Sequence, residues 1–559
     1  RTTDRRSSLD SPPALHYLSD MSLRGTGHGG ALRRTAEVFQ VLGAAGILHP
    51  RYLASMLPAM RKFGTSSATG FHAAAKRHPE RPAVVDEAGV LSFAEVDRAT
   101  NALARGLAAA GVEAGEGVGL FARNHRGFIQ AQAALDKLGA NTLLLNTGFA
   151  APQLKEVCKR EGIRVLLHDE EFREIVEEGA GELTRFLTWS EGSSTGTTLE
   201  KLAASHDEAE LEPPPSPGRV TVLTSGTTGT PKGARRTLKR QGVDTFVGLF
   251  GRMPLRTGTR NLIAAPVFHS WGGLHLLVGA QLGCTLCLRR RFDPEDTLAA
   301  IHELRPQVLA VVPVMMQRIL ELGPEVIGRY DTSSLEMVCA SGSALPGDLA
   351  RRWMDVFGDH VYNFYGSTEV AHASIAMPDE LRAAPGTAGR PPRGVIVKIL
   401  DDQGRELPPG RTGRIFVANE AQFEGYTGGG GKETIAGLMS SGDVGHFDEQ
   451  GLLFVDGRDD DMIVSGGENA FPREVEDLLA GRQEVLEAAV IGVDDAEFGQ
   501  RLKAFVVLQP GARTDEQQLK DYVKEHLARY KVPREVVFLD ALPRNTTGKV
   551  LKRKLAGGA

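Results

Sequence analysis

Short apolar runs alternate along the first half of the chain with segments in which apolar residues recur every three or four positions. The runs at residues 118–121, 142–145 and 163–167 predict buried strands, and the segments at 127–138 and 154–160 predict helices. This alternation is typical of a doubly wound α/β sheet. Because ligands bind such sheets at the carboxyl ends of the strands, we expect a binding site at that edge.

Ahead of this region the pattern predicts a hairpin followed by a helix. Residues 83–85 and 90–92 are largely apolar and flank a polar turn, as in a β-hairpin. Ser92 and Glu95 have the spacing of a capping box, in which each side chain binds the backbone N–H of the other residue. We therefore expect a helix that begins after Ser92 and runs to about residue 110.

The end of the chain has an alternation of its own. Apolar runs at residues 488–493 and 504–508 predict strands, and residues 473–479 predict a helix. Thr514 and Gln517 have the spacing of a second capping box, which predicts the start of the last long helix. A segment with this content can form a small separate lid.

These patterns predict an α/β protein in three parts, as the length of 559 residues also suggests. We expect an N-terminal extension over residues 1–66, a large domain over 67–458 and a small C-terminal α+β lid domain over 459–559. The large domain contains doubly wound α/β subdomains and a twisted β-subdomain that includes residues 395–417.

The N-terminal extension has two regions of different composition. Residues 1 to about 34 are rich in Arg, Ser, Gly and Pro and are expected to be loose. Residues 36–63 contain many apolar residues and few charges, and they predict two short helices around His49 and Pro50. Two interpretations remain open for this segment: peripheral contact with a membrane surface, and a helical arm that packs on the main body, which we favour.

Composition excludes several classes of protein. The hydrophobic fraction of 41% and the charged fraction of 24% are those of a soluble globular chain. The net charge of −5 provides no basic field for nucleic acid. With only four cysteines, we expect structural thiols and a reducing compartment; the pair Cys284 and Cys287 has metal-ligand spacing but no second pair. We expect a cytoplasmic protein, at the inner membrane face if the arm contacts lipid, with a homodimer as one candidate oligomer.

A loop of small residues follows the apolar run at 220–222 and ends in Pro-Lys-Gly. Its glycines let backbone N–H groups approach an anion, its hydroxyls add donors, and Lys232 adds positive charge. The spacing differs from that of a Walker loop because Pro231 precedes the lysine. The sequence therefore predicts a polyphosphate site formed by Thr224, Ser225, Gly226, Thr227, Thr228, Gly229 and Lys232.

Further motifs follow this loop in a distinctive order. They are Ser-Gly-Ser-Ala at 341–344, Tyr-Gly-Ser-Thr-Glu at 365–369, Ser-Gly-Asp at 441–443, Gly-Arg-Asp-Asp at 457–460, Ser-Gly-Gly at 465–467 and Asn-Thr-Thr-Gly-Lys at 545–549. With the loop, the set resembles the adenylate-forming superfamily of acyl-CoA synthetases, firefly-type luciferases and peptide-synthetase adenylation domains. The resemblance covers residues 67–555 and is greatest to bacterial fatty-acid CoA ligases.

The resemblance implies an ATP site with a magnesium ion. The loop hydroxyls and Lys232 would hold the β- and γ-phosphates, and Thr368 would contact the α-phosphate. Glu369 would bind Mg²⁺, a hard cation that prefers oxygen ligands. The adenine and ribose would contact Gly342, Ser343, Ala344, Tyr365, Gly366, Asp443 and Arg458. Ser343 stands where the family commonly has Gly, and Leu438-Met439 precede the Ser-Gly-Asp motif where relatives often have Trp and Thr.

The resemblance also assigns the two half-reactions to different faces of a mobile lid. Lys549 matches the catalytic lysine that stabilises charge between the carboxylate and the α-phosphate. The lid would then rotate about Asp460 and present Ser465, Gly466 and Gly467 to the pantetheine arm of coenzyme A.

The acyl pocket is expected near residues 266–273. His269 matches a position that lies near the reacting carboxylate in relatives, and we interpret it as an orienting or gating group. Trp271 is interpreted as part of a gate to the acyl tunnel.

The leading hypothesis is therefore an AMP-forming acid–thiol ligase whose partners are a small-molecule carboxylic acid, ATP, Mg²⁺ and CoA. We expect the acid to be a medium- or long-chain fatty acid. The alternatives are an aryl-acid CoA ligase and an acyl-AMP ligase that loads a carrier protein. A more remote alternative is an inactive lipid-binding scaffold, which the presence of Lys232, Glu369 and Lys549 disfavours.

Overall fold

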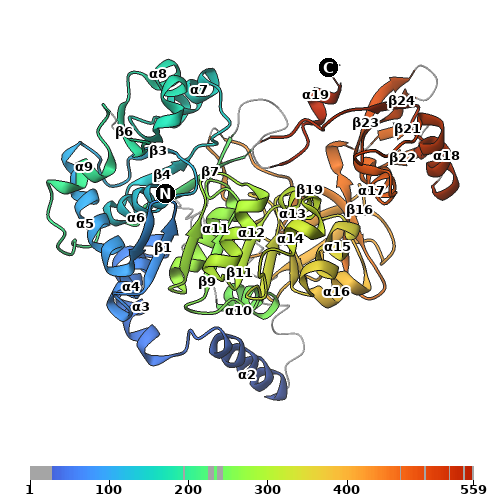
Figure 1. Ribbon diagram of the computed structural model, residues 1–559. Coiled ribbons are helices and arrows are strands. Elements are labelled where there is room, and N and C mark those ends of the chain that lie inside the picture. The colour runs from blue at the N-terminus through green and yellow to red at the C-terminus, as the bar shows by residue number, and fades with distance from the viewer. Residues whose placement is uncertain are drawn as a thin grey trace, which may run out of the picture.

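The computed structural model of the protein (Figure 1) describes residues 28–192, 195–224, 232–235, 243–427, 429–461, 463–465, 468–495, 499–527, 529–545 and 548–556. For a few of these residues, including Thr224, Lys232, Asp460 and Ser465, the backbone alone is described. Among the described residues the strands form four sheets. Two large sheets make the centre of the molecule, and the C-terminal elements group on one side (Figure 1).

A seven-stranded sheet contains the first predicted alternation, in the order β17-β8-β7-β4-β3-β5-β6. Strands β3 to β7 are parallel, and β8 and β17 extend the sheet antiparallel. The predicted doubly wound α/β fold is thereby confirmed. The strands are β3 (Gly117–Phe121), β4 (Asn141–Leu144), β5 (Val165–Asp169), β6 (Thr184–Trp189), β7 (Val220–Thr224), β8 (Lys232–Arg235) and β17 (Gly425–Tyr426).

The predicted hairpin lies in a second sheet of eight strands, in the order β14-β13-β12-β11-β9-β10-β1-β2. β1 pairs in parallel with β10, with Val84 opposite Leu286, so the hairpin joins strands from much later in the chain. This sheet contains β1 (Pro82–Asp86), β2 (Gly89–Ser92), β9 (Arg260–Ile263), β10 (Thr285–Leu288), β11 (Val308–Val311), β12 (Met337–Ala340), β13 (Val361–Tyr365) and β14 (Ser374–Ala376).

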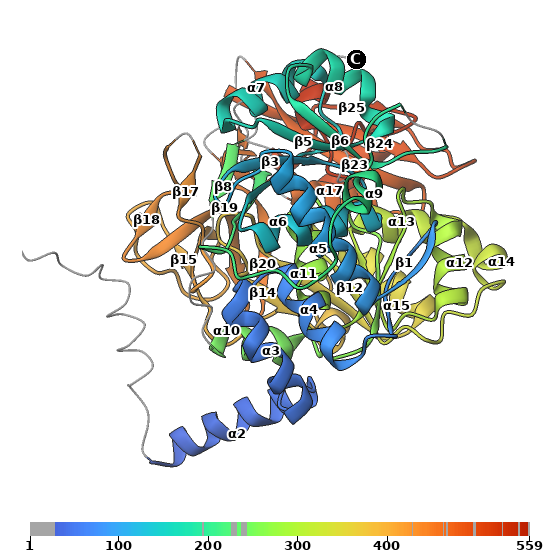
Figure 2. The ribbon, with the colours of Figure 1, turned by 90° about the vertical axis from the view of Figure 1, so that its left-hand side faces the viewer.

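Helices cover the two sheets and fill the space between them (Figure 2). The Ser92–Glu95 capping box is present and begins α5 as predicted. The helices of this part are α4 (Ser67–Arg77), α5 (Phe93–Ala109), α6 (Arg126–Leu138), α7 (Ala151–Glu161), α8 (Arg173–Ala180), α9 (Leu199–Ala204), α10 (Val243–Arg252), α11 (Ser270–Gln281), α12 (Pro294–Leu304), α13 (Pro313–Glu321), α14 (Gly323–Ile327), α15 (Gly347–Phe357) and α16 (Pro378–Ala383).

The β-subdomain and the lid follow in the chain. The β-subdomain has β15 (Ile396–Leu400), β16 (Gly413–Ala418), β18 (Thr434–Ile435), β19 (Leu438–Phe447) and β20 (Leu453–Arg458). The lid has β21 (Ile463–Ser465), β22 (Glu468–Ala470), α17 (Pro472–Ala480), β23 (Val485–Asp495), β24 (Gly499–Leu508), α18 (Glu516–His526), β25 (Glu535–Phe538) and α19 (Lys552–Ala556). Each part has an apolar core of its own.

One predicted helix start in the lid is wrong. The cap of α18 is Asp515, whose carboxylate accepts the backbone N–H of Gln518. The Thr514 hydroxyl instead donates to the Gln518 side chain. Asp515 is an equally good N-cap residue, and the register one position later keeps Leu519 and Val523 buried against the lid sheet.

The N-terminal arm forms the two predicted helices, α2 (His28–Ala44) and α3 (Pro50–Phe63). The helix starts at His28, so the expected loose chain is wrong for residues 28–34; residues 1–27 lie outside the described part. α3 packs on α4 as the favoured interpretation predicts. α2 projects from the body (Figure 1 and Figure 2), and its Glu37 forms an ion pair with Arg393 of the large domain. In the described part, no helix has the length and apolarity that a membrane crossing needs.

Candidate active site

Three predicted nucleotide-binding residues meet at the junction of the eight-stranded sheet and the β-subdomain. Asp443 in β19 lies directly opposite Arg458, the last residue of β20. Arg458 Nη1 donates to Asp443 Oδ1 over 3.2 Å. Tyr365, at the end of β13, donates its hydroxyl to Asp443 Oδ2 over 2.6 Å. The structure therefore brings together Tyr365, Asp443 and Arg458, which are far apart in the sequence.

The environment of Asp443 combines burial with nearby positive charge. Burial raises the pKa of the Asp443 carboxyl, while the charge of Arg458, the hydrogen bond from Tyr365 and the charge of Lys549 act in the opposite direction. A carboxylate has about four lone-pair positions, of which Tyr365 and Arg458 use two. The remaining positions can accept hydrogen bonds from a diol.

Lys549 lies in a loop of the lid that rests on the large domain. The loop is closed by two hydrogen bonds between Lys549 and Asn545, in which each backbone N–H is a donor. The backbone at Gly548 approaches α13 so closely that an added Cβ would lie 2.2 Å from Val314 Cγ1. Lys549 itself is exposed, and its charge reaches Asp443. The loop of Lys549 is thus docked on α13 of the large domain, and the lysine acts on Asp443 through its charge.

Thr368 and Glu369 follow Tyr365 in the same loop. The Thr368 hydroxyl lies 3.2 Å from the Ser270 hydroxyl at the start of α11. Glu369 Oε1 accepts a hydrogen bond of 2.9 Å from the hydroxyl of Tyr426. One partly exposed carboxylate and a hydroxyl fit Mg²⁺, which proteins commonly bind through one or two carboxylates together with substrate phosphates. The part of the chain described here contains no cluster of three or more His, Cys, Asp or Glu residues suited to a metal.

The predicted adenine segment follows β12. Gly342, Ser343 and Ala344 are exposed there, and Gly342 has a φ of +90°, which favours glycine. Gly366 lies against the backbone of Ala371, where a Cβ would come within 2.0 Å of the carbonyl oxygen. β12 and β13 are parallel neighbours, so the exposed segment at 342–344, which follows β12, lies at the same edge of the sheet as Tyr365.

His269 and Trp271 lie at the start of α11 among other aromatic rings. Trp271 Nε1 donates to the carbonyl oxygen of Val311 over 3.0 Å, and its ring lies 5.0 Å from Phe364 and 4.5 Å from His275. The Nε2 atoms of His269 and His275 are buried, and no described residue forms a hydrogen bond with them. Burial lowers the pKa of each imidazole to about 4, so both are neutral at pH 7.

The structure leaves some predicted residues outside its described part. These are Ser225, Gly226, Thr227, Thr228, Gly229, Gly466 and Gly467. The sheet strand before the predicted phosphate loop, β7, ends at Thr224, and the strand after it, β8, begins at Lys232. Asp460 lies in a single 3₁₀ turn, Asp459–Asp461, directly after β20. All four cysteines are free and buried, as expected for structural thiols.

Sequence reasoning missed three residues near these groups. Tyr426 and His275 occur in segments with no motif that points to chemistry. Lys432 follows a run of glycines, and its ammonium lies 2.9 Å from the position of a Cβ built on Gly442, beside Arg458. No spacing rule in the sequence indicates the contacts of Tyr426 and Lys432, because each of them joins different segments of the chain. His275 contacts Trp271 four residues earlier in the same helix, α11.

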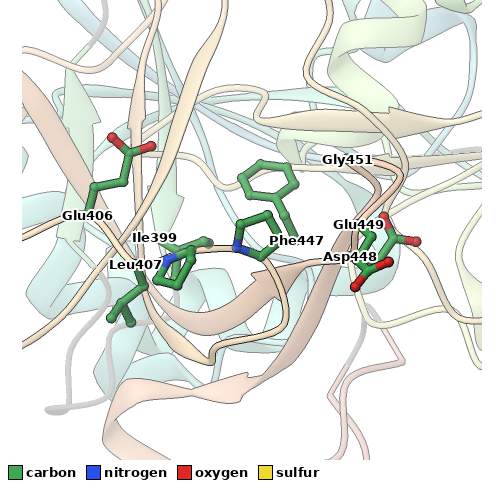
Figure 3. A pocket seen from close by; sticks show the side chains of 9 residues that line it. Ile399, Glu406, Leu407, Phe447, Asp448, Glu449 and Gly451 are labelled. Carbon is green, nitrogen blue, oxygen red and sulfur yellow. The ribbon is translucent and has the colours of Figure 1, made fainter.

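A separate cavity of about 230 Å³ lies in the β-subdomain (Figure 3). It is lined by Ile399, Glu406, Leu407, Pro408, Pro409, Phe447, Asp448, Glu449 and Gly451. None of these residues is a predicted site residue.

Comparison with known proteins identifies the family. Residues 71–427 match the family model of the AMP-binding enzyme, and residues 474–549 match that of the AMP-binding enzyme C-terminal domain. The chain belongs to the AMP-binding enzyme family. It is an adenylate-forming acyl- or aryl-CoA ligase, a class that uses ATP, Mg²⁺ and CoA, as the resemblance implied.

Members of the family that are similar to this chain are named for different carboxylic acids. A feruloyl-CoA synthase of Amycolatopsis sp is 35% identical over 493 residues, which cover 86% of this chain and 96% of the relative. The fatty acid–[acyl-carrier-protein] ligase ScoC of Streptomyces coeruleorubidus is 30% identical over 512 residues, covering 87% and 95%. The solved structure of the anthranilate CoA ligase AuaEII with anthranoyl-AMP has a TM-score of 0.79 at 25% identity, covering 88% and 96%.

Proposed function

We propose that the protein joins a medium- or long-chain fatty acid to CoA in two steps. In the first step the carboxylate attacks the α-phosphorus of ATP, which forms acyl-AMP and releases pyrophosphate. In the second step the CoA thiolate attacks the acyl carbon and AMP leaves. The observation that supports this proposal most directly is the contact of Tyr365 and Arg458 with Asp443, on which the charge of the lid lysine Lys549 also acts.

In the first step the protein acts mainly by placing charge. Asp443 accepts hydrogen bonds from the ribose hydroxyls, and Tyr365 offers its ring to the adenine. The ammonium of Lys549 stabilises the negative charge that develops between the carboxylate and the α-phosphate. Glu369 would hold Mg²⁺, which supplies positive charge for the phosphate oxygens.

His269 orients the acid and does not contribute a charge. Because burial lowers its pKa to about 4, the imidazole is neutral at the pH of the reaction. A neutral ring beside the carboxylate leaves the acid anionic, as its attack on phosphorus requires. Trp271 contributes to the wall of the acyl site through its contact with Phe364.

The second step requires Lys549 to leave the site. We propose that the lid rotates about Asp460, separates Gly548 from Val314, and brings the Ser-Gly-Gly segment at 465–467 to the pantetheine channel. The short 3₁₀ turn at Asp459–Asp461 supports this assignment, because it joins two separately packed units.

An aryl acid is a second candidate substrate. The names of the feruloyl-CoA synthase and of the anthranilate CoA ligase support it, as do the rings of Trp271, His275 and Phe364 near the predicted acyl position. Transfer to a carrier protein is a further candidate, supported by the name of ScoC.

A carboxylate panel tests these proposals together. The purified protein is incubated with ATP, Mg²⁺ and one acid at a time, and the exchange of labelled pyrophosphate into ATP is measured. CoA is then added and the thioester is detected by mass spectrometry. We expect exchange and thioester with fatty acids of medium or long chain. Exchange with cinnamic or benzoic acids alone supports the aryl candidate, and exchange without thioester supports the carrier candidate. A lack of exchange with every acid of the panel contradicts the proposed substrate class.

A further inference from the structure

A short segment connects the loop of Glu369 with the strand that leaves the phosphate loop. This segment, residues 423–427, is here called the strap. Its β17 pairs antiparallel with β8, with Tyr426 opposite Ala234. Because β8 begins at Lys232, the strap contacts the exit of the predicted phosphate loop.

Phe423 and Tyr426 of the strap bind Glu369, the first at its backbone and the second at its carboxylate. The backbone N–H of Phe423 donates to the Glu369 carbonyl over 2.8 Å. The Tyr426 hydroxyl donates to Glu369 Oε1 over 2.9 Å. The rings of Phe423 and Tyr426 pack edge to face with centroids 4.9 Å apart, which fixes the direction of the phenol. The second carboxylate oxygen of Glu369 can therefore face a cation in a defined orientation.

The other end of the strap is bonded to the residue after Lys232. Thr427 and Gly233 exchange two hydrogen bonds: the Thr427 N–H donates to the Gly233 carbonyl over 2.8 Å, and the Gly233 N–H donates to Thr427 Oγ1 over 3.1 Å. The Thr427 hydroxyl donates in turn to Glu161 over 2.5 Å. A Cβ at position 233 would lie 2.7 Å from Thr427 Oγ1, so this approach requires glycine.

We propose that Tyr426 is a positioning residue that aims the Glu369 carboxylate at the metal ion of bound ATP, and that the strap sets the spacing between Glu369 and the start of β8. The proposal rests on the proposed function, in which Glu369 binds Mg²⁺. Magnesium demands near-octahedral geometry at about 2.0–2.1 Å, so a ligand that turns freely binds it poorly. Hydrogen-bond partners of metal-binding carboxylates orient them and strengthen metal binding.

The variant Tyr426→Phe tests the proposal, because it removes the hydroxyl and keeps the ring. Mn²⁺ serves as the probe for Mg²⁺, and its binding to the complex of enzyme and ATP is measured by electron paramagnetic resonance. We expect the dissociation constant of Mn²⁺ to rise roughly tenfold or more, as for other partners of metal ligands. Thioester formation from supplied acyl-AMP and the melting temperature should stay close to wild type. Wild-type affinity for Mn²⁺ in Tyr426→Phe overturns the proposal.

Tyr52→Phe is the matched control. This tyrosine also donates from a part-buried position, to the carbonyl of Gln281 over 3.1 Å, but it lies in the N-terminal arm. The control should bind Mn²⁺ as the wild type does. If Tyr426→Phe does not fold, Thr427→Val provides the test, since it removes the hydroxyl at the other end of the strap and should raise the KM for ATP and the dissociation constant of Mn²⁺ together. No change in either value overturns the spacing role.

Glu369→Gln separates this inference from the function on which it rests. If Glu369→Gln loses Mn²⁺ affinity and Tyr426→Phe keeps it, the positioning role of Tyr426 is wrong and the metal assignment stands. If Glu369→Gln binds Mn²⁺ like the wild type, the metal assignment itself is wrong. Loss in both variants, with wild-type binding in Tyr52→Phe, supports the proposal.

Discussion

At the scale of single residues, a few side chains from distant segments of the chain define the proposed site. Asp443 contacts Tyr365 and Arg458 through its two oxygens, and the charge of Lys549 reaches it from the lid. The residue types were visible in the sequence, since each stands in a motif. Their contacts were not, because Tyr365 and Asp443 belong to different sheets and only the folded chain brings them together.

Lys549→Ala should separate the two half-reactions. The lost contact is made in the transition state of the first step, so we expect adenylation to slow by two or more orders of magnitude, about 3 kcal/mol. Thioester formation from supplied acyl-AMP should persist. Pyrophosphate exchange and thioester formation are measured for each variant. Lys520→Ala is the control, because Lys520 pairs with Glu516 within the lid. Equal loss of both half-reactions would refute the role given to Lys549.

His275 should make the folded protein sensitive to acid. Its pKa of about 4 lies below the ordinary value of 6.5, so between these pH values the unfolded chain binds a proton that the folded protein excludes. Stability therefore falls as the pH drops from 6.5 toward 4. The free energy of unfolding of the wild type should therefore fall relative to that of His275→Leu by about 2 kcal/mol between pH 7 and pH 5. The loss begins near pH 6.5, and the 1.5 pH units from there to pH 5 correspond to about 2 kcal/mol.

Denaturant unfolding at pH 7 and pH 5 measures this difference. The exposed His526 provides the control variant His526→Leu, which should follow the wild type at both pH values. If the free energies of unfolding of His275→Leu and the wild type differ by the same amount at both pH values, the buried neutral imidazole is not the cause of the acid sensitivity.

At the scale of elements, local sequence patterns predicted individual helices and strands but not how the strands pair. The Ser92–Glu95 capping box and the repeat of strand and helix from β3 to β5 depend on residues close in sequence, and both were predicted. The pairing of β1 with β10 joins Val84 to Leu286, and no local signal specifies it. The start of α18 was misplaced because Thr514 and Asp515 are both good caps, and burial of Leu519 and Val523 selects the second.

Gly548 should matter for docking of the lid loop. An added Cβ would lie 2.2 Å from Val314, and the φ of +79° is itself unfavourable for alanine. We expect Gly548→Ala to lower pyrophosphate exchange by at least about tenfold, which corresponds to about 1.4 kcal/mol of lost docking. Thioester formation from supplied acyl-AMP should be retained.

Gly511 provides a matched control for this clash. It is a lid glycine with a φ of +78°, and an added Cβ would meet no atom within 4 Å. Gly511→Ala therefore has the same backbone strain without the contact. If both variants lose exchange to the same extent, the strain and not the contact with Val314 explains the loss.

At the scale of the whole molecule, the chain is built as a large body and a small C-terminal unit with separate cores. The described contacts between the two units include Gly548 on Val314, the Gln317 side chain on the Leu486 carbonyl at 3.4 Å and the Arg473 guanidinium on the Val455 carbonyl at 2.8 Å. The sequence predicted this division from the second alternation after residue 459. It did not predict the docking surface, because the residues of α13 that form it have no motif.

Asp460→Pro should impair the step that needs rotation. Proline fixes φ near −65° and would hold the 3₁₀ turn in one conformation. Adenylation should remain near wild type, because the docked arrangement already exists, whereas thioester formation should slow strongly. Single-turnover kinetics of each half-reaction measure both effects, with Asp460→Ala as the flexible control. An unchanged second half-reaction would exclude Asp460 as the hinge.

The most direct test of the whole account is the product balance of one reaction with ATP, Mg²⁺, CoA and an accepted carboxylic acid. Nucleotides and thioester are quantified together by liquid chromatography and mass spectrometry. We predict AMP, pyrophosphate and acyl-CoA in equal amounts, with acyl-AMP accumulating when CoA is withheld. Formation of ADP and phosphate, or of a thioester without acyl-AMP, would contradict it.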